Sequence, residues 1–205
     1  MLKKAISCMM TAIILMMTSS CASTMPIPRS PIFSTELLTT STGARFHWVL
    51  TEKQRIRVLI GVDTTDTYLT AVQIAVRYWN DRIGKDVLVI DYSTEFASVP
   101  KAISICRVNL DSYESPAGPR LLGQTFLGGD KDIGEISGVI ILLDVGLPDE
   151  FIDTTVTHEL GHALALAHDN SDENSLMFPY MWSAEQQQLT PEDLMAVRSQ
   201  FVLLF

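Results

Sequence analysis

The chain has 205 residues, of which 47% are hydrophobic and 19% charged, and its formal net charge at pH 7 is −9. This length suits one domain with a sizeable core, and the contents of glycine (11) and proline (9) argue against a fibrous or wholly disordered chain. The acidic balance argues against nucleic acid as a partner, because phosphate binding needs clustered Lys and Arg. Nothing in the composition suggests a polytopic membrane protein.

The beginning of the chain is typical of an export signal. Lys3 and Lys4 precede residues 5–17, which are mostly apolar and carry no charge. This run is too short to cross about 30 Å of hydrocarbon as a helix, but it suits the apolar region of a secretory signal. We therefore expect the protein to be exported.

Residues 18–21, Thr-Ser-Ser-Cys, resemble the lipobox of bacterial lipoproteins, although Thr18 stands where that family usually has Leu. The resemblance implies a signal peptide over residues 1–20 and lipidation of Cys21. A bacterial cell envelope is then the expected location, with a lipid anchor in the membrane. Ordinary cleavage near Ala22, giving a secreted protein, and an uncleaved anchor are the alternatives.

The rest of the chain divides into a tether and one domain. Residues 21–45 are rich in Ser, Thr and Pro without a sustained period, which is typical of a tether. The domain is predicted over residues 46–205, and we expect it to be a monomer. If Cys21 is lipidated, Cys106 is the one cysteine of the mature folded part and no internal disulfide can form. Cys106 is expected to be a half-buried thiol within a strand.

Alternating and periodic apolar residues predict the elements of the domain in chain order. Strands are expected at residues 55–62, 87–92, 102–108, 121–127 and 136–143, with a turn at 128–130. Apolar residues recur at helical spacing at Val72, Ala75, Val76, Trp79 and Ile83, which predicts an amphipathic helix with Trp79 in the core, and a second helix is expected to begin near residues 149–153. This order indicates a mixed α/β or α+β domain.

A last helix is predicted near the end of the chain. Thr190 is expected to be its N-cap, with Pro191 at the first helical position and an acid at the third. The apolar stripe of this helix is predicted to consist of Leu194, Val197, Phe201 and either Leu204 or Phe205.

The second helix carries the motif H-E-x-x-H at His158, Glu159 and His162. Residues i and i+4 of a helix lie on one face about 5–6 Å apart, so both imidazoles can converge on one cation. Glu159 is rotated about 100° from His158, which places its carboxylate beside the metal. The pattern predicts a zinc site with an adjacent general base.

A third histidine, His168, lies six residues beyond His162. A continuing helix would place it about 9 Å further along the axis, too far for all three to bind one zinc ion. If His168 is a ligand, the helix must end near Ala165 and the chain must turn back. Three neutral imidazoles would leave a fourth position of zinc open, as in catalytic sites.

The segment H-E-L-G-H-A-L-A-L-A-H resembles the metzincin zinc signature H-E-x-x-H-x-x-G-x-x-H, and in detail it is similar to the matrixin branch. The resemblance implies that His158, His162 and His168 bind one catalytic Zn²⁺ and that Glu159 is the catalytic residue. It also implies a twisted, mostly parallel five-stranded sheet, an active-site helix and a C-terminal helix.

Further segments extend the resemblance. Residues 175–180, S-L-M-F-P-Y, are similar to the matrixin Met-turn, which implies that Met177 lies beneath the zinc. Pro179 and Tyr180 would then line the primary specificity pocket. Residues 123–127 and 134–144 are similar to the strands beside the family's cleft, where substrate binds as an added strand.

Two positions depart from the family pattern. Ala165 replaces the glycine of the signature, and a left-handed alanine there would cost about 1–2 kcal/mol. The alternative is that His168 does not bind zinc and that a downstream acid, Glu185 or Glu173, takes its place. Asp169 stands where matrixins commonly have Ser, which weakens the assignment to the branch.

A second metal is considered for the acidic residues around the last strands. Asp130, Asp132, Glu135 and Asp144 could bind calcium, which takes six to eight oxygen ligands. The alternative reading is an acidic, solvated turn.

The predicted activity is that of a zinc-dependent endopeptidase. A metal-activated water would attack the peptide bond with Glu159 as general base, and an extended peptide or protein substrate would pair with residues 121–127. No latency peptide with an unpaired cysteine is recognised. The alternatives are a catalytically silent, zinc-containing lipoprotein that binds peptides, and a purely structural lipoprotein.

Overall fold

The structure of the protein is a computed structural model and describes residues 18–19, 38–61, 64–92, 99–110, 122–180 and 188–204. Its strands and helices follow in the order β1 (Thr18–Ser19), β2 (Trp48–Thr51), β3 (Ile56–Ile60), α2 (Asp66–Ile83), β4 (Leu88–Asp91), β5 (Ala102–Val108), β6 (Gly123–Gly129), β7 (Ile136–Asp144), α3 (Asp149–Ala163), α4 (Pro191–Ser199) and β8 (Phe201–Leu204). The strands predicted at 55–62, 87–92, 102–108, 121–127 and 136–143 correspond to β3, β4, β5, β6 and β7. The turn predicted at residues 128–130 is displaced, because β6 continues to Gly129.

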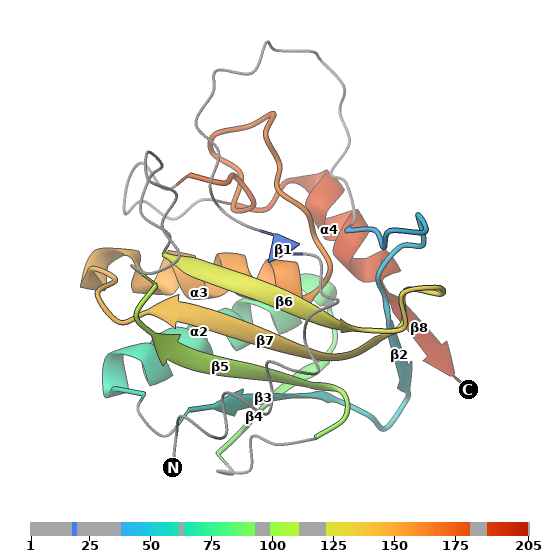
Figure 1. Ribbon diagram of the computed structural model, residues 1–205, viewed down its shortest axis with the longest axis horizontal. Helices are drawn as coiled ribbons and strands as arrows, with labels where there is room; N and C mark the ends of the chain where they lie inside the picture. Colours follow the sequence, from blue (N-terminus) through green and yellow to red (C-terminus); the bar gives the residue numbers. More distant parts are fainter. Residues whose placement is uncertain are drawn as a thin grey trace.

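One sheet forms the centre of the domain (Figure 1). Its strands lie in the order β1-β6-β7-β5-β3-β4, and β7, β5, β3 and β4 run parallel to one another. β6 runs antiparallel to β7, and the two-residue β1 pairs antiparallel with β6. The prediction of a mixed α/β domain with a mostly parallel five-stranded sheet is therefore confirmed for β3 to β7.

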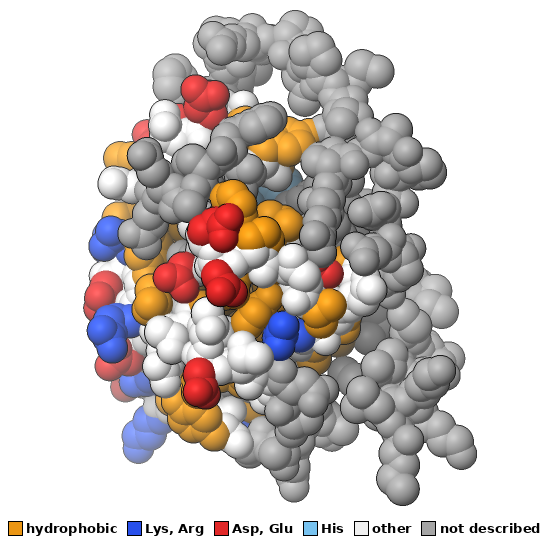
Figure 2. Space-filling model, turned by 90° about the vertical axis from the view of Figure 1, so that its left-hand side faces the viewer, with side chains coloured by type: hydrophobic (Ala, Val, Ile, Leu, Met, Phe, Trp, Pro, Cys, Tyr) orange, Lys and Arg blue, Asp and Glu red, His pale blue; other side chains and the backbone are white. Residues whose placement is uncertain are grey.

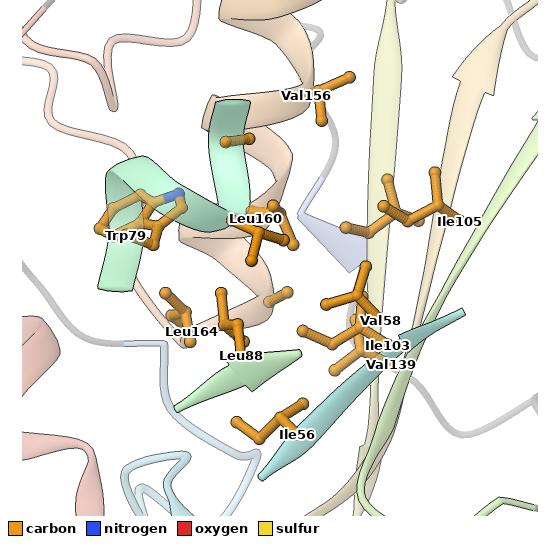
Figure 3. Close-up of a cluster of buried hydrophobic side chains, with 14 of the residues drawn as sticks. Ile56, Val58, Trp79, Leu88, Ile103, Ile105, Val139, Val156, Leu160 and Leu164 are labelled. Carbon is orange, nitrogen blue, oxygen red and sulfur yellow. The ribbon is translucent and has the colours of Figure 1, made fainter. Parts of the chain in front are cut away.

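The core lies between the sheet and the helices α2 and α3, which cover one of its faces (Figure 1). Figure 3 shows Ile103, Ile105 and Val139 of the sheet pointing toward Val156 and Leu160 of α3. All five side chains are buried. Since burial of one such side chain contributes about 1.5–3 kcal/mol, this contact fixes α3 firmly against the sheet.

Trp79 of α2 contacts α3, and its predicted place in the core is confirmed. Its side chain is 0% exposed, and its Nε1 donates a hydrogen bond to the backbone carbonyl of Thr157 over 3.0 Å. Thr157 precedes His158 directly, so α2 supports the part of α3 that carries the H-E-x-x-H motif.

The predicted C-terminal helix begins as expected and ends earlier. The hydroxyl of Thr190 accepts a hydrogen bond from the backbone N–H of Asp193, and the carboxylate of Asp193 accepts one from the backbone N–H of Thr190, which completes a capping box. The predicted apolar stripe is wrong beyond Val197, since α4 ends at Ser199 and Phe201 begins β8. β8 pairs in parallel with β2, another strand that the sequence pattern did not predict.

Part of the predicted tether packs on the domain. Thr39 and Arg45 form an isolated antiparallel bridge, and the partly buried Leu38 packs against the core. The ordered chain around the site therefore includes residues that precede the predicted domain boundary.

The described surface mixes side chains of all kinds. Figure 2 shows acidic side chains spread over one face among hydrophobic ones, with most of the Lys and Arg side chains along its left-hand edge. None of the helices in the described part of the chain combines the length and apolar character needed to cross a membrane.

Candidate active site

α3 places both histidines of the motif in the interior. The helix begins after Pro148, and Asp149 and Glu150 in its first turn suit the positive end of the helix dipole. Its second half is buried on every side, including His158 and His162. The motif is therefore enclosed by protein rather than displayed on a solvent-facing stripe.

The chain reverses direction after α3 through a left-handed residue. Ala165 has a φ of 67°, and its backbone N–H donates to the carbonyl of His162 over 2.8 Å. The N–H of Leu166 then reaches back to the carbonyl of Gly161 over 3.1 Å, as in a Schellman C-cap. The turn predicted near Ala165 is confirmed, and it carries the backbone strain expected of alanine in that conformation, about 1–2 kcal/mol.

This turn brings the third histidine to the first two. The nitrogen atoms that His158, His162 and His168 offer to a metal all lie within 4.8 Å of one another. The Nε2 atoms of His162 and His168 are 3.1 Å apart. Of the two alternative ligands, Glu173 is exposed and outside this cluster, whereas Glu185 lies outside the described residues.

Backbone carbonyls orient two of the imidazoles. Nδ1 of His158 lies 2.7 Å from the carbonyl of Leu176, and Nδ1 of His162 lies 2.7 Å from the carbonyl of Leu166. A proton on Nδ1 makes each bond and leaves the Nε2 lone pair for a metal, which is the usual arrangement of metal-binding histidines.

The histidine cluster fits zinc. Two nitrogens bound to one Zn²⁺ at about 2.0–2.1 Å with tetrahedral angles lie roughly 3.3 Å apart, close to the spacing of the Nε2 atoms of His162 and His168. Burial lowers the pKa of His158 to about 4. Burial and the neighbouring His158 lower the pKa of His168 to about 3. Burial and both neighbours lower the pKa of His162 well below its usual value, so all three rings are neutral at pH 7, as metal ligation requires.

Met177 lies against the motif helix. It is 0% exposed, and a Cβ at Gly161 would come within 2.5 Å of its sulfur atom. Only a glycine at position 161 therefore lets α3 approach Met177 so closely. Pro179 and Tyr180, which follow it, are half-buried.

The Met177 segment is tied to its surroundings by hydrogen bonds. The backbone N–H of Met177 donates to the hydroxyl of Ser175 over 3.1 Å, and that hydroxyl donates to Oδ2 of the buried Asp193 over 3.4 Å. The carbonyl of Met177 accepts from the N–H of Asp169 over 2.9 Å. α4 thus supports the loop whose Leu176 carbonyl contacts the ring of His158.

Glu159 is held between α3 and β6. The residue is 1% exposed, and the hydroxyl of Thr125 donates to its Oε2 over 2.6 Å. Burial raises the pKa of Glu159 to about 7, and the hydrogen bond from Thr125 opposes this rise. Gly123, two residues before Thr125, contacts the other side of the carboxylate.

Sequence reasoning did not assign roles to Gly123 and Thr125. It placed both residues in a strand beside the cleft, and their spacing of two predicts that they share one face. The contact with Glu159 depends on how β6 packs against α3, for which the sequence held no signal.

The acidic residues considered for calcium lie apart. Asp144, at the end of β7, is 1% exposed and accepts a hydrogen bond from the backbone N–H of Leu110 over 3.2 Å. Asp130 precedes the start of β7, and its Oδ1 accepts from the N–H of Asp132 over 2.8 Å. The length of β7, about 26 Å at 3.3 Å per residue, excludes Asp144 from a site at Asp130. Calcium binding by the Asp130 loop stays a prediction.

Comparisons with known proteins agree with this geometry. The sequence model of the matrixin family matches residues 147–202, which contain α3, the three histidines, Met177 and α4. The structure is similar to that of archaemetzincin from Methanopyrus kandleri, with a TM-score of 0.50 and 14% sequence identity over 74% of this chain and 98% of the other. A search of curated proteins gave no match. The family match and the shared fold together support a zinc metallopeptidase of the metzincin-like fold.

Proposed function

We propose that this protein is a zinc-dependent endopeptidase that hydrolyses peptide bonds in protein or peptide substrates. The observation that carries the proposal is the convergence of three neutral histidines with a buried glutamate beside them on the same helix. A structural zinc site has no need of such a glutamate, whereas hydrolysis needs a group that accepts a proton.

His158, His162 and His168 are the residues that would hold the zinc ion. When bound, zinc polarises a carbonyl oxygen and lowers the pKa of water toward about 7. The carbonyls of Leu176 and Leu166 keep two of the rings turned so that Nε2 points into the cluster.

Glu159 acts as general base and then as general acid. Its carboxylate accepts a proton from the water that attacks the peptide carbonyl and delivers that proton to the departing amine nitrogen. A pKa of about 7 suits both steps at neutral pH. Thr125 holds the carboxylate by its hydrogen bond to Oε2.

The outer edge of β6 is the proposed substrate-binding strand. Thr18 and Ser19 of this chain pair antiparallel with Phe126 and Thr125, which supports an edge that accepts an extended segment in that direction. Main-chain hydrogen bonds would give affinity with little sequence preference, and Pro179 and Tyr180 would contribute side-chain selectivity.

We also propose that the protein is exported and that Cys21 carries a lipid. The charged start, the apolar run at residues 5–17 and the lipobox-like residues 18–21 support this proposal. Processing before Cys21 would remove β1 and leave the edge of β6 unpaired. The mass of the mature N-terminal peptide, compared between the wild type and Cys21→Ser, tests it: loss of an acylated peptide in the variant supports lipidation, and an unmodified Cys21 in the wild type contradicts it.

The activity is tested on the chain from residue 21 onward, which lacks β1 and leaves the edge of β6 unpaired, after it has been loaded with zinc. We would incubate it with a diverse peptide library and identify the cleaved bonds by mass spectrometry. Glu159→Ala is expected to keep zinc and lose about 10²- to 10⁴-fold in turnover, whereas Glu150→Ala, at an exposed position of the same helix, is expected to resemble the wild type. Absence of cleavage with one zinc bound would favour the silent peptide-binding protein, and absence of both would contradict the ligand assignment.

A further inference from the structure

Thr125 of β6 contacts Glu159 at two atoms. Its side chain is 2% exposed, and its hydroxyl oxygen lies 2.6 Å from Oε2 and 3.1 Å from the backbone oxygen of Glu159. The hydroxyl has one proton to donate, and the shorter distance to the carboxylate favours that oxygen as its acceptor. The contact therefore joins the side chain of Glu159 to a rigid strand on the other side of the site.

Gly123 supplies the space in which the carboxylate lies. Side chains alternate along a strand, so positions 123 and 125 face the same way, toward α3. A Cβ at position 123 would lie 2.7 Å from Oε1, 2.8 Å from Cγ and 2.9 Å from Cδ of Glu159. These distances are too short for any side chain, so Glu159 can occupy this position only beside a glycine.

We propose that Gly123 and Thr125 are positioning residues for catalysis, which together fix the carboxylate of Glu159 on β6. Thr125 holds Oε2, and the open space above Gly123 receives the side of the carboxylate that carries Oε1. This inference rests on the proposed peptidase activity and assigns to β6 a second role beside substrate binding.

The physical reason for such a pair lies in the flexibility of glutamate. A Glu side chain has three rotatable bonds, and a displacement of about 1 Å at a reacting group can lower a rate about 100-fold. The helix backbone alone does not fix the carboxylate, because Glu159 points toward the strand rather than along α3. A hydrogen bond on one oxygen, with a closely fitting space for the remainder, removes this freedom before substrate binds.

Three variants of Thr125 and a control test the hydrogen bond. Thr125→Val keeps the shape and removes the hydroxyl, and we expect it to lower kcat about 10- to 100-fold with KM within about twofold and with zinc retained. Thr125→Ser keeps the hydroxyl and should recover most of kcat, whereas Thr125→Ala should resemble Val. The control is Thr155→Val, a buried threonine of α3 whose hydroxyl donates to the carbonyl of Phe151, and it should keep the kcat of the wild type.

A glycine comparison tests the space. Gly123→Ala should displace the carboxylate and lower kcat by about 100-fold or more while zinc is retained. Its control is Gly138→Ala in β7, where a Cβ would meet only the carbonyl oxygen of Ala102 at 3.6 Å, an ordinary contact. Melting temperatures of all variants show whether a loss of activity reflects unfolding.

Crystal structures of the zinc-loaded wild type, Thr125→Val and Gly123→Ala give a result that does not depend on activity. We expect Glu159 to lie between Gly123 and Thr125 in the wild type and to leave this position in Gly123→Ala. A wild-type Glu159 located elsewhere, or Thr125→Val with an unchanged kcat, would overturn the inference. An inactive wild type with Glu159 in this position would instead contradict the peptidase activity.

Discussion

The backbone N–H of Leu38 donates a hydrogen bond to the carbonyl of Ala165 over 3.0 Å. Ala165 is the left-handed residue of the turn between His162 and His168. This bond therefore connects that turn to Leu38, which lies in the predicted tether. The chain before the predicted domain boundary therefore helps to hold the third histidine in place.

Ala165→Gly should stabilise the fold. Glycine adopts a φ of 67° without the steric cost that alanine has there, and its greater freedom in the unfolded chain offsets only part of the gain. We expect the free energy of unfolding to rise by up to about 1 kcal/mol and the melting temperature by about 2–4 °C. The control is Ala163→Gly, at the last position of α3, which should lower stability by about 1 kcal/mol. Equal destabilisation by both changes would contradict a strained Ala165.

His168→Ala should abolish stoichiometric zinc binding. The change leaves two nitrogens of the cluster and removes the ring whose Nε2 lies 3.1 Å from that of His162. Zinc content after dialysis, measured by atomic emission, is expected to fall from one ion per chain to a small fraction. Glu173→Ala and His47→Ala, outside the cluster, should keep one ion per chain. Loss of zinc in Glu173→Ala alone would favour the alternative ligand set.

The metal-free protein should lose stability in acid. The folded-state pKa values of His158, His162 and His168 lie below that of an unfolded histidine, so the unfolded chain takes up more protons as the pH falls below about 6.5. This contribution is present above that pH and is lost on the way down to about 4. Glu159 acts in the opposite direction, because its pKa is raised and its contribution is present at low pH and lost as the pH rises through about 7.

Three histidines outweigh one glutamate, so the net change is a loss of stability in acid. Urea unfolding of chelator-treated protein should give a free energy of unfolding lower by roughly 1–3 kcal/mol at pH 5.5 than at pH 7.5. In Glu159→Gln, which removes the opposing group, the difference should be larger. A stability that increases toward pH 5.5 in the wild type would contradict the buried, neutral histidines.

Asp193→Ala should destabilise the protein more than a surface change in the same helix. Asp193 is 0% exposed, accepts from the backbone N–H of Thr190 over 3.0 Å and contacts the hydroxyl of Ser175. Loss of the capping box and of a buried hydrogen bond is expected to lower the free energy of unfolding by about 2–3 kcal/mol. Glu192→Ala, the exposed neighbour, should change it by less than about 0.5 kcal/mol, and guanidinium unfolding of both variants checks the difference. Similar values for the two would contradict the supporting role of Asp193.

Local patterns predicted much of the fold and of the metal site. The alternation of apolar residues found the strands of the main sheet, because period two follows from the strand backbone itself. The spacing of His158, Glu159 and His162 predicted their arrangement on α3, since four residues make about one helical turn. The distance along a helix also showed that His168 could join them only after a turn near Ala165.

The same patterns failed where a distant segment decides the structure. Phe201 continues the apolar spacing of α4, yet it begins β8. Its backbone pairs there with β2, and a local pattern cannot reveal a partner so far away in the sequence. Asp144 was grouped with Asp130 as a candidate calcium ligand because both are acidic, but the length of β7 separates the two residues. β2 was not predicted either, and its partner β8 lies at the far end of the chain.

The sequence by itself determined the chemistry of the site: the histidines, the glutamate and the turn that brings them together all lie within eleven consecutive residues. Short-range geometry of the helix is enough to relate such residues. Only the tertiary structure decided which groups surround Glu159, because Gly123 and Thr125 reach it through the packing of β6 on α3. Contacts across more than thirty residues depend on how the whole chain buries its apolar surface, and local periodicity carries no information about them.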